Sequence, residues 1–470
     1  MFGLVSQPGS SHDELFHASS IWCASGEKSP YCENITVDPV QGPSATTNID
    51  VYVCQKEADT PLICPTDRAG KVSLLTNGGL YQGLFYRVMN LFVGPSYEVS
   101  FVLIRLFNAF VISLLLAVAS LLLPRRHRIA LMLVVISVLS PSGYYLFASL
   151  NPSSWTVIGV LVAWLSCHAA IFQKSIGSRE RWCIGVLGVV SAVMAVGSRW
   201  DALPYLVFAG ALTLLSELWS RFARQRLWLI GVMVSVGSVA LLLVGRATPL
   251  SPVDNLSSLI TFSDGQPDNV DFITHFMLHG VPKALEALGE VPSMTGIYLP
   301  RLVLLVGFFV LGLMMTSSFN ATRPMQSFGV ICSAVCVSLV LMAHHAGMDE
   351  RDPFGPSSRY VLPLLAFAVG WWYLLAPQEF ERRVSERMKL VTYLATFSFG
   401  LTVFTVAERN VDRQAFGLRF LPEGPDQWWW SWMPIGPNVV VFLAVSFMYL
   451  FLKGISVSIF SHDQTNPSTK

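Results

Sequence analysis

Two adjacent carboxylates and a nearby histidine, Asp13, Glu14 and His17, stand close to the start of the chain. A carboxylate beside an attacking hydroxyl can take its proton as a general base. The same pair with His17 has the ligand atoms to hold a divalent cation, Mg²⁺ or Mn²⁺, against a phosphate. A structural alternative is a capping box, in which Ser11 caps a helix and Glu14 follows one turn later. The residues alone leave the metal requirement and the choice among these roles open.

Three arginines, Arg105, Arg199 and Arg359, have the chemistry to bind a phosphate group on the face that carries the carboxylates. A planar guanidinium binds phosphate oxygens bidentately, and an arginine inside an apolar span is a functional hypothesis by default. Each arginine also has a structural alternative. Arg105 could extend to the lipid headgroups, and Arg359 could anchor the end of a helix. Arg199 could form an ion pair with Asp201.

The composition excludes an ordinary soluble enzyme. Hydrophobic residues make up 53% of the 470 residues and charged residues only 13%, about half the charged fraction of a typical soluble protein. The net charge of +1 gives no indication of nucleic-acid binding. Metalloprotease, P-loop, dinucleotide-binding and GxSxG motifs are missing from the sequence. We therefore expect a protein that works in contact with the lipid bilayer.

Long uncharged runs separated by short charged clusters predict an all-α polytopic membrane protein with about eleven transmembrane helices, since roughly 17–25 apolar residues cross a bilayer. Short interfacial helices and irregular extracytoplasmic loops are expected to connect them. The predicted spans are residues 99–123, two spans within 129–173 separated by 151–154, and residues 183–198, 202–219, 227–245, 298–316, 325–344, 360–375, 390–407 and 438–453.

The distribution of lysine and arginine predicts the orientation of the chain, because short cytoplasmic loops are enriched in these residues. Three long intervening loops are acidic and are expected outside. The basic loops are residues 124–128, 174–181, 221–226 and 379–389. The predicted organisation is an extracytoplasmic N-terminal loop (1–97), a multi-span membrane domain (98–453) and a cytoplasmic tail (454–470). In a bacterium this places the protein in the cytoplasmic membrane.

The N-terminal loop is rich in Pro, Gly, Ser, Asp and Asn and shows no hydrophobic period, so we expect an irregular cap. Apolar residues then recur at three and four positions in 80–93, which predicts an amphipathic helix in the outer interface. No span in the sequence could carry this loop across the membrane. We therefore expect a natural first helix, the twelfth, before Met1.

Four cysteines lie in the same N-terminal loop: Cys23, Cys32, Cys54 and Cys64. An even number of cysteines in an extracytoplasmic loop predicts two disulfides. Three pairings are possible, and Cys23–Cys32 with Cys54–Cys64 is our working choice. The spacing does not fit a zinc site, since no CxxC occurs.

Several short motifs occur in an order that resembles a bacterial family of polytopic membrane proteins catalogued as domain of unknown function 2142. The family's usual acidic residue after Asn-Pro is Ser153 here, and its leading helix is absent. The matching pieces are Pro8 with Asp13, Glu14 and His17, then Arg105-Leu106-Phe107-Asn108, Ser140-Pro141 with Ala148-Ser149-Leu150-Asn151-Pro152, and Ser358-Arg359-Tyr360 with Leu362-Pro363.

That family resembles membrane glycosyltransferases of the GT-C type, and the resemblance implies a function by analogy of fold. Such enzymes take a sugar from a polyprenyl-phosphate donor on the outer face and carry an acidic residue in the first outer loop. The resemblance implies that Asp13 or Glu14 is the base or metal contact. The implied partners are a polyprenyl-phosphate-linked sugar and a cell-envelope glycan or lipid-linked acceptor.

Two other classes of function remain open. A transporter or flippase of a lipid-linked glycan would carry charges well inside its spans and inverted repeats, whereas the predicted spans are nearly free of charge. A non-catalytic partner of an envelope-polysaccharide synthase would tolerate the loss of Asp13, Glu14 and Arg359.

Overall fold

The computed structural model describes most of the helical part of the chain and three short strands. The described residues are 2–6, 14–25, 32–38, 42–47, 75–77, 83–139, 142–221, 301–317, 329–333, 362–376, 379–411 and 435–460. The elements are α1 (Phe2–Val5), α2 (Glu14–Trp22), β1 (Cys32–Asp38), β2 (Gly42–Thr47), β3 (Leu75–Asn77), α3 (Gly83–Asn90), α4 (Tyr97–Leu122), α5 (Arg125–Ser137), α6 (Ser142–Phe147), α7 (Ser153–Phe172), α8 (Ser178–Ser198), α9 (Ala202–Arg221), α14 (Arg301–Thr316), α16 (Leu362–Leu374), α17 (Glu379–Val411) and α18 (Pro437–Phe460).

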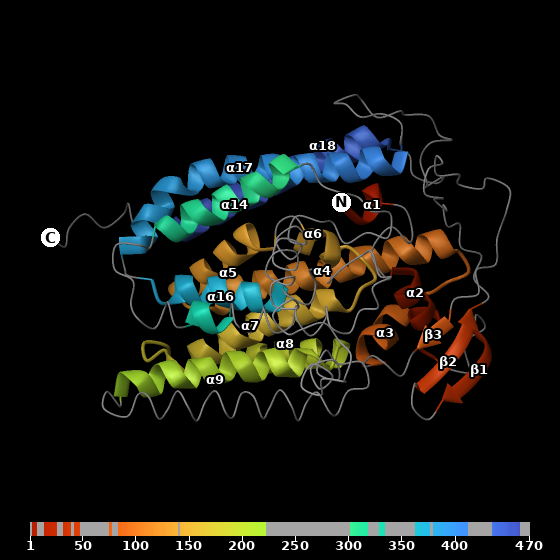
Figure 1. Ribbon diagram of the computed structural model, residues 1–470, viewed down its shortest axis with the longest axis horizontal. Helices are drawn as coiled ribbons and strands as arrows, with labels where there is room; N and C mark the ends of the chain where they lie inside the picture. The colour runs from red at the N-terminus through yellow and green to blue at the C-terminus, as the bar shows by residue number, and fades with distance from the viewer. Residues whose placement is uncertain are drawn as a thin grey trace, which may run out of the picture.

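The long helices share one direction and lie in layers (Figure 1). α14, α17 and α18 form one outer layer, α8 and α9 form the opposite one, and α4, α5, α7 and α16 lie between them. Contacts of α7 with α8 and α9, and of α5 with α14 and α18, hold the layers together. The short helices α2 and α3 and the sheet lie together at one end of the bundle.

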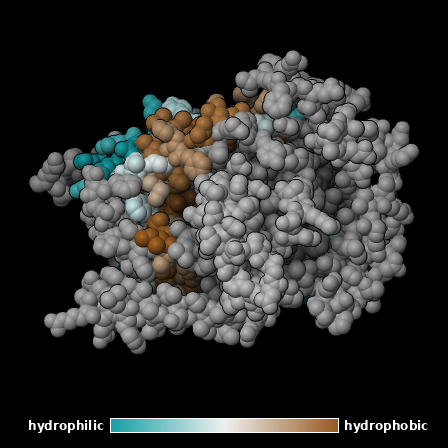
Figure 2. All heavy atoms as spheres, in the orientation of Figure 1, coloured by the Kyte–Doolittle hydropathy of each residue, from teal (hydrophilic) through white to brown (hydrophobic). Residues whose placement is uncertain are grey.

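Several helices expose apolar side chains on their outer faces, as helices surrounded by lipid do. On α4 the large exposed apolar residues are three, four or seven positions apart, which places them in one stripe: Val99, Leu103, Leu106, Phe110, Leu114 and Leu121. Figure 2 shows hydrophobic side chains gathered over the layer of α14 and α17, with hydrophilic ones at the end where α17 begins. The chain is a multi-pass membrane protein.

Five described helices are long and apolar enough to cross a bilayer: Tyr97–Leu122, Ser153–Phe172, Ser178–Ser198, Glu379–Glu408 and Pro437–Val457. Each contains or overlaps a predicted span. α8 and α17 begin earlier than predicted, because the charged residues that precede their apolar stretches are good helix formers and continue the helix. The total of eleven spans stays a prediction, since the spans at 227–245 and most of 325–344 lie outside the described residues.

The predicted second span is a broken helix rather than a continuous one. α5 is 13 residues long, or about 20 Å, which is too short to cross a bilayer alone. Val138 and Leu139, which follow α5, are no longer helical, and α6 begins at Ser142. Leu139, Leu150 and Asn151 are almost fully buried, so the described non-helical backbone on either side of α6 lies against protein rather than lipid, as membrane proteins require.

The N-terminal loop contains a small antiparallel sheet in the order β1-β2-β3, so the prediction of an irregular cap was wrong here. β1 pairs with β2 through a register shift between Glu33 and Thr36, and β2 pairs with β3. The predicted helix at 80–93 is present as α3. It packs against α2 and α8 and buries Phe85, Tyr86 and Met89.

Two of the basic loops meet at the end of the bundle opposite the sheet. Arg125 forms an ion pair with Glu381 at 3.3 Å, and Arg126 donates to the carbonyl of Ala376. Arg387 donates to the Leu313 carbonyl at 2.7 Å. The bundle therefore has a basic end, where α5 and α17 begin, and a second end that carries α2, α3 and the start of α7.

Candidate functional site

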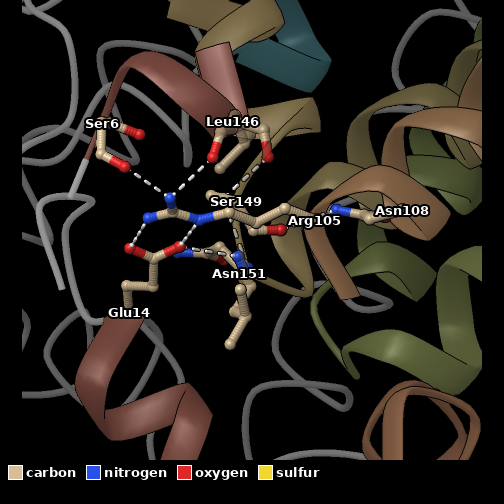
Figure 3. Close-up of polar contacts among 9 residues, drawn as sticks. Ser6, Glu14, Arg105, Asn108, Leu146, Ser149 and Asn151 are labelled. Carbon is tan, nitrogen blue, oxygen red and sulfur yellow. Dashed lines mark hydrogen bonds and ion pairs between the residues drawn. The ribbon is translucent and has the colours of Figure 1, made fainter. Parts of the chain in front are cut away.

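Glu14 and Arg105 form a buried ion pair at the end of the bundle away from the basic loops. Arg105 Nε donates to Glu14 Oε1 at 2.9 Å and Nη2 donates to Oε2 at 2.6 Å. The two side chains are 0% and 1% exposed. Figure 3 shows the guanidinium lying against the carboxylate, with both groups pointing toward each other from different helices. The structural alternative for Arg105, an extension to the lipid headgroups, is therefore wrong.

The ion pair is completed by backbone groups, which a buried pair needs if it is to offset its desolvation. Arg105 Nη1 donates to the carbonyls of Gly3 and Ser6 at 2.9 and 2.7 Å. The amide of Leu150 donates to Glu14 Oε1 at 3.3 Å. Gly3 allows the close approach of α1, because a Cβ there would lie 3.1 Å from Arg105 Cβ. One ion pair thus joins α1, α2, α4 and the segment before α7.

Asn108 lies one turn after Arg105 on α4 and therefore faces the same side of the helix. It is 0% exposed. Its Nδ2 donates to the Ser149 carbonyl at 2.8 Å and to Ser154 Oγ at 3.1 Å. Its Oδ1 accepts from Trp155 Nε1 at 2.9 Å. Asn108 therefore holds the start of α7 against α4, next to the ion pair.

The start of α7 is buried and held by local hydrogen bonds. Asn151 Oδ1 accepts from the backbone amide of Ser153 at 2.9 Å, which satisfies one of the free N–H groups of the helix terminus. Ser149 Oγ donates to the Leu146 carbonyl at 2.8 Å. Serine and asparagine favour such turns, because their side chains bond nearby backbone groups.

Arg199 approaches the same helix start from the end of α8. Its Nη1 donates to Ser153 Oγ at 3.0 Å, and its Nη2 lies 2.7 Å from Asp201 Oδ2. The structural alternative for Arg199, an ion pair with Asp201, is therefore present. The side chains of Arg199 and Asp201 are 8% and 20% exposed, so this pair is more open than that of Glu14 and Arg105.

His17 and Cys23 lie on or just after α2, beside the site. His17 is 0% exposed, and its Nδ1 lies 2.9 Å from the hydroxyl of Tyr86 on α3. Cys23 is disulfide-bonded. Cys32 lies in β1, while Cys54 and Cys64 lie outside the described residues, so the pairing stays a prediction.

The structure brings four separate stretches of sequence into one hydrogen-bonded group, which we call the polar cluster: Glu14, Arg105, Asn108, Ser149, Asn151, Ser153, Ser154, Arg199 and Asp201. Glu14, Arg105 and Arg199 were candidate site residues. Asp13 and Arg359 lie outside the described residues. The central place of Asn108 was missed, although its position one turn from Arg105 was a signal that could have found it.

The described part of the polar cluster does not fit a divalent cation. Both carboxylate oxygens of Glu14 already accept hydrogen bonds, from Arg105 and from the backbone amide of Leu150. The adjacent guanidinium would also repel a cation. Among the residues that the structure describes, no three His, Cys, Asp or Glu side chains gather in a way that could hold a metal ion.

The fold and the polar cluster define a multi-pass membrane protein with a buried network of charged and polar groups at one end. The chain belongs to the family described as predicted membrane protein, domain of unknown function 2142, whose model matches residues 1–275. This range includes the whole polar cluster. No curated protein and no solved structure matches the chain.

Proposed function

We propose that this protein is a membrane glycosyltransferase of the outer face of the cytoplasmic membrane. It moves a sugar from a polyprenyl-phosphate donor to a glycan or lipid-linked acceptor. The observation that carries the proposal is the Glu14–Arg105 ion pair, which anchors the start of α2 beside the start of α7 and Arg199. The basic loops at the opposite end support the orientation, because they belong in the cytoplasm.

Glu14 is a positioning residue in this proposal, because both its oxygens are engaged. Asp13 directly precedes it in the chain and is the carboxylate to which we assign the general base. The acceptor hydroxyl attacks the anomeric carbon of the donor and gives its proton to Asp13. The bond from this carbon to the phosphate oxygen breaks, and polyprenyl phosphate leaves with both bonding electrons.

Arg199 is the residue that we assign to the leaving phosphate. Its ion pair with Asp201 is more open than the Glu14–Arg105 pair, so its guanidinium can exchange one carboxylate contact for phosphate oxygens. Charge-assisted hydrogen bonds of this kind stabilise the negative charge that develops on a leaving phosphate. Arg105 has no such role here, since its guanidinium is fully engaged by Glu14 and by the carbonyls of Gly3 and Ser6.

A direct test uses the purified full-length chain in lipid nanodiscs. Undecaprenyl phosphate carrying glucose, galactose, mannose or arabinose is offered with a glycan fraction from the cell envelope. We expect the release of undecaprenyl phosphate from one of these donors together with a sugar-bearing acceptor, both measured by mass spectrometry. If all four donors stay intact while their binding is demonstrated, the transferase proposal fails.

A transporter of a lipid-linked glycan is the second candidate, and the break between α5 and α6 favours it. Discontinuous helices with buried irregular backbone form the substrate sites of many transporters. In proteoliposomes a transporter would move the intact lipid-linked sugar between leaflets without releasing undecaprenyl phosphate. The same mass-spectrometric assay therefore separates the two candidates.

A further inference from the structure

Tyr97, the first residue of α4, carries a buried hydroxyl that the polar cluster does not use. The residue is partly exposed, but its hydroxyl oxygen is buried and has no hydrogen-bond partner among the residues that the structure describes. The side chain therefore directs its hydroxyl into the protein. A buried hydroxyl without a partner destabilises the folded state, because it loses its hydrogen bonds to water.

The ring of Tyr97 is held by aromatic neighbours from two helices. Its centroid lies 5.4 Å from that of Trp22 on α2 and 4.6 Å from that of Phe101, one turn further along α4. Trp22 and Phe101 are 1% and 0% exposed. A phenylalanine would make the same ring contacts without the unpaired hydroxyl, so packing alone does not explain a tyrosine at this position.

Tyr97 lies one aromatic ring away from the ion pair at the centre of the polar cluster. Its ring packs against Phe101, and the Arg105 guanidinium lies 5.3 Å from the centroid of that same Phe101 ring. Glu14 and Arg105 already pair with each other, and a further charge buried without a counter-ion would be costly. A neutral polar group is therefore the better match for the Tyr97 hydroxyl, because it can exchange hydrogen bonds with it without bringing a charge into the protein.

We infer that the Tyr97 hydroxyl binds a neutral hydroxyl group of the sugar that the protein transfers. A sugar hydroxyl both donates and accepts hydrogen bonds, as the tyrosine hydroxyl does. Tyr97 is then a specificity-determining residue that hydrogen-bonds the hydroxyl at one position of the sugar ring, while Arg199 binds the phosphate. This inference rests on the proposed transferase function and adds the part of the substrate that is recognised at α4.

The experiment compares the wild-type chain with Tyr97→Phe in nanodiscs, with bare undecaprenyl phosphate and with the four sugar-bearing forms named above. Without lipid ligand, we expect Tyr97→Phe to unfold at the wild-type temperature or higher. Tyr144→Phe is the matched control, since the Tyr144 hydroxyl donates to the Val135 carbonyl at 2.9 Å. That variant is expected to unfold at a lower temperature.

With ligand, we expect Tyr97→Phe to bind the preferred sugar-bearing lipid about tenfold more weakly than wild type, the usual effect of one lost hydrogen bond, and to bind bare undecaprenyl phosphate equally well. Equal loss for both lipids, no loss for either, or a lowered unfolding temperature without ligand would each overturn the inference while the transferase proposal stands. If the wild-type chain binds no sugar-bearing lipid better than bare undecaprenyl phosphate, the transferase proposal fails and the inference fails with it.

Discussion

The guanidinium of Arg105 and the carboxylate of Glu14 meet through two hydrogen bonds of 2.9 and 2.6 Å across a sequence separation of 91 residues. This pair closes the polar cluster from the side of α2. Because both groups are buried, the loss of either one leaves an uncompensated charge inside the bundle. The pair therefore ties the position of the N-terminal segment to the stability of the whole cluster.

Glu14→Gln is expected to lower the free energy of unfolding by about 3–5 kcal/mol, because it leaves Arg105 charged and buried without its carboxylate. The double variant Glu14→Leu with Arg105→Met is expected to lose less free energy of unfolding than the sum of the losses in Glu14→Leu alone and Arg105→Met alone. Chemical unfolding in detergent measures each value. Glu180→Gln is the control, because Glu180 is exposed and its change should stay within about 0.5 kcal/mol. If the loss in the double variant equals the sum of the losses in the two single variants, the Glu14–Arg105 pairing is contradicted.

Asn108→Leu is expected to lower the free energy of unfolding by about 1–3 kcal/mol for each buried group that it leaves unpaired. These groups are the Trp155 indole N–H and the Ser149 carbonyl. The matched control is Gln173→Leu, because the Gln173 amide donates to the exposed Ser175. A stability of Asn108→Leu equal to that of the control would show that Asn108 does not hold the start of α7.

Gly159→Ala tests the close packing of α7 on α8. A Cβ at Gly159 would lie 2.7 Å from the Ser191 carbonyl and 2.8 Å from Ala195 Cβ, so the helices must separate. Small residues at such crossings let membrane helices approach closely. We expect a loss of about 1–3 kcal/mol from overpacking. Gly185→Ala, which has nothing within 4 Å of its Cβ, should be neutral or slightly stabilising, and equal effects of the two changes would refute the crossing.

The orientation predicts which end of the bundle a membrane-impermeant thiol reagent reaches in intact spheroplasts. Leu91 is 79% exposed and lies between α3 and α4, while Arg179 is exposed in the first turn of α8, within the basic segment 174–181. Leu91→Cys should be labelled from outside, above the labelling of the parent chain. Arg179→Cys should be labelled only after permeabilisation. The reverse pattern would invert the predicted orientation and would place the proposed active site on the cytoplasmic face.

The sequence predicted the five long apolar helices of the described residues well, because a bilayer demands long apolar runs whatever their neighbours are. α4, α8, α17 and α18 all contain a predicted apolar core. The break after α5 was not predicted, since an apolar run gives no periodic signal where it changes from helix to buried turn. The sheet was missed for a related reason, because strands in a polar loop lack the alternation that a buried face imposes.

The composition of the polar cluster was only partly accessible from sequence. Their charged side chains marked Glu14, Arg105 and Arg199 as candidates, and the order of spans and loops predicted that all three lie at the same end of the bundle. The sequence did not predict which of these residues form an ion pair with each other. Glu14 pairs with Arg105 rather than standing free as a base, and that depends on the packing of α2 against α4. Asn108 gave a weaker signal because a buried amide carries no charge.

In the proposed mechanism, Asp13 is the general base of a sugar transfer, and the Glu14–Arg105 pair only positions it. The most direct measurement is the rate of undecaprenyl phosphate release by Asp13→Asn in nanodiscs, with the donor that wild type uses. We expect a fall of about 100-fold or more, as for the loss of a general base, with a wild-type unfolding temperature. Release by Asp13→Asn at the wild-type rate would contradict the account.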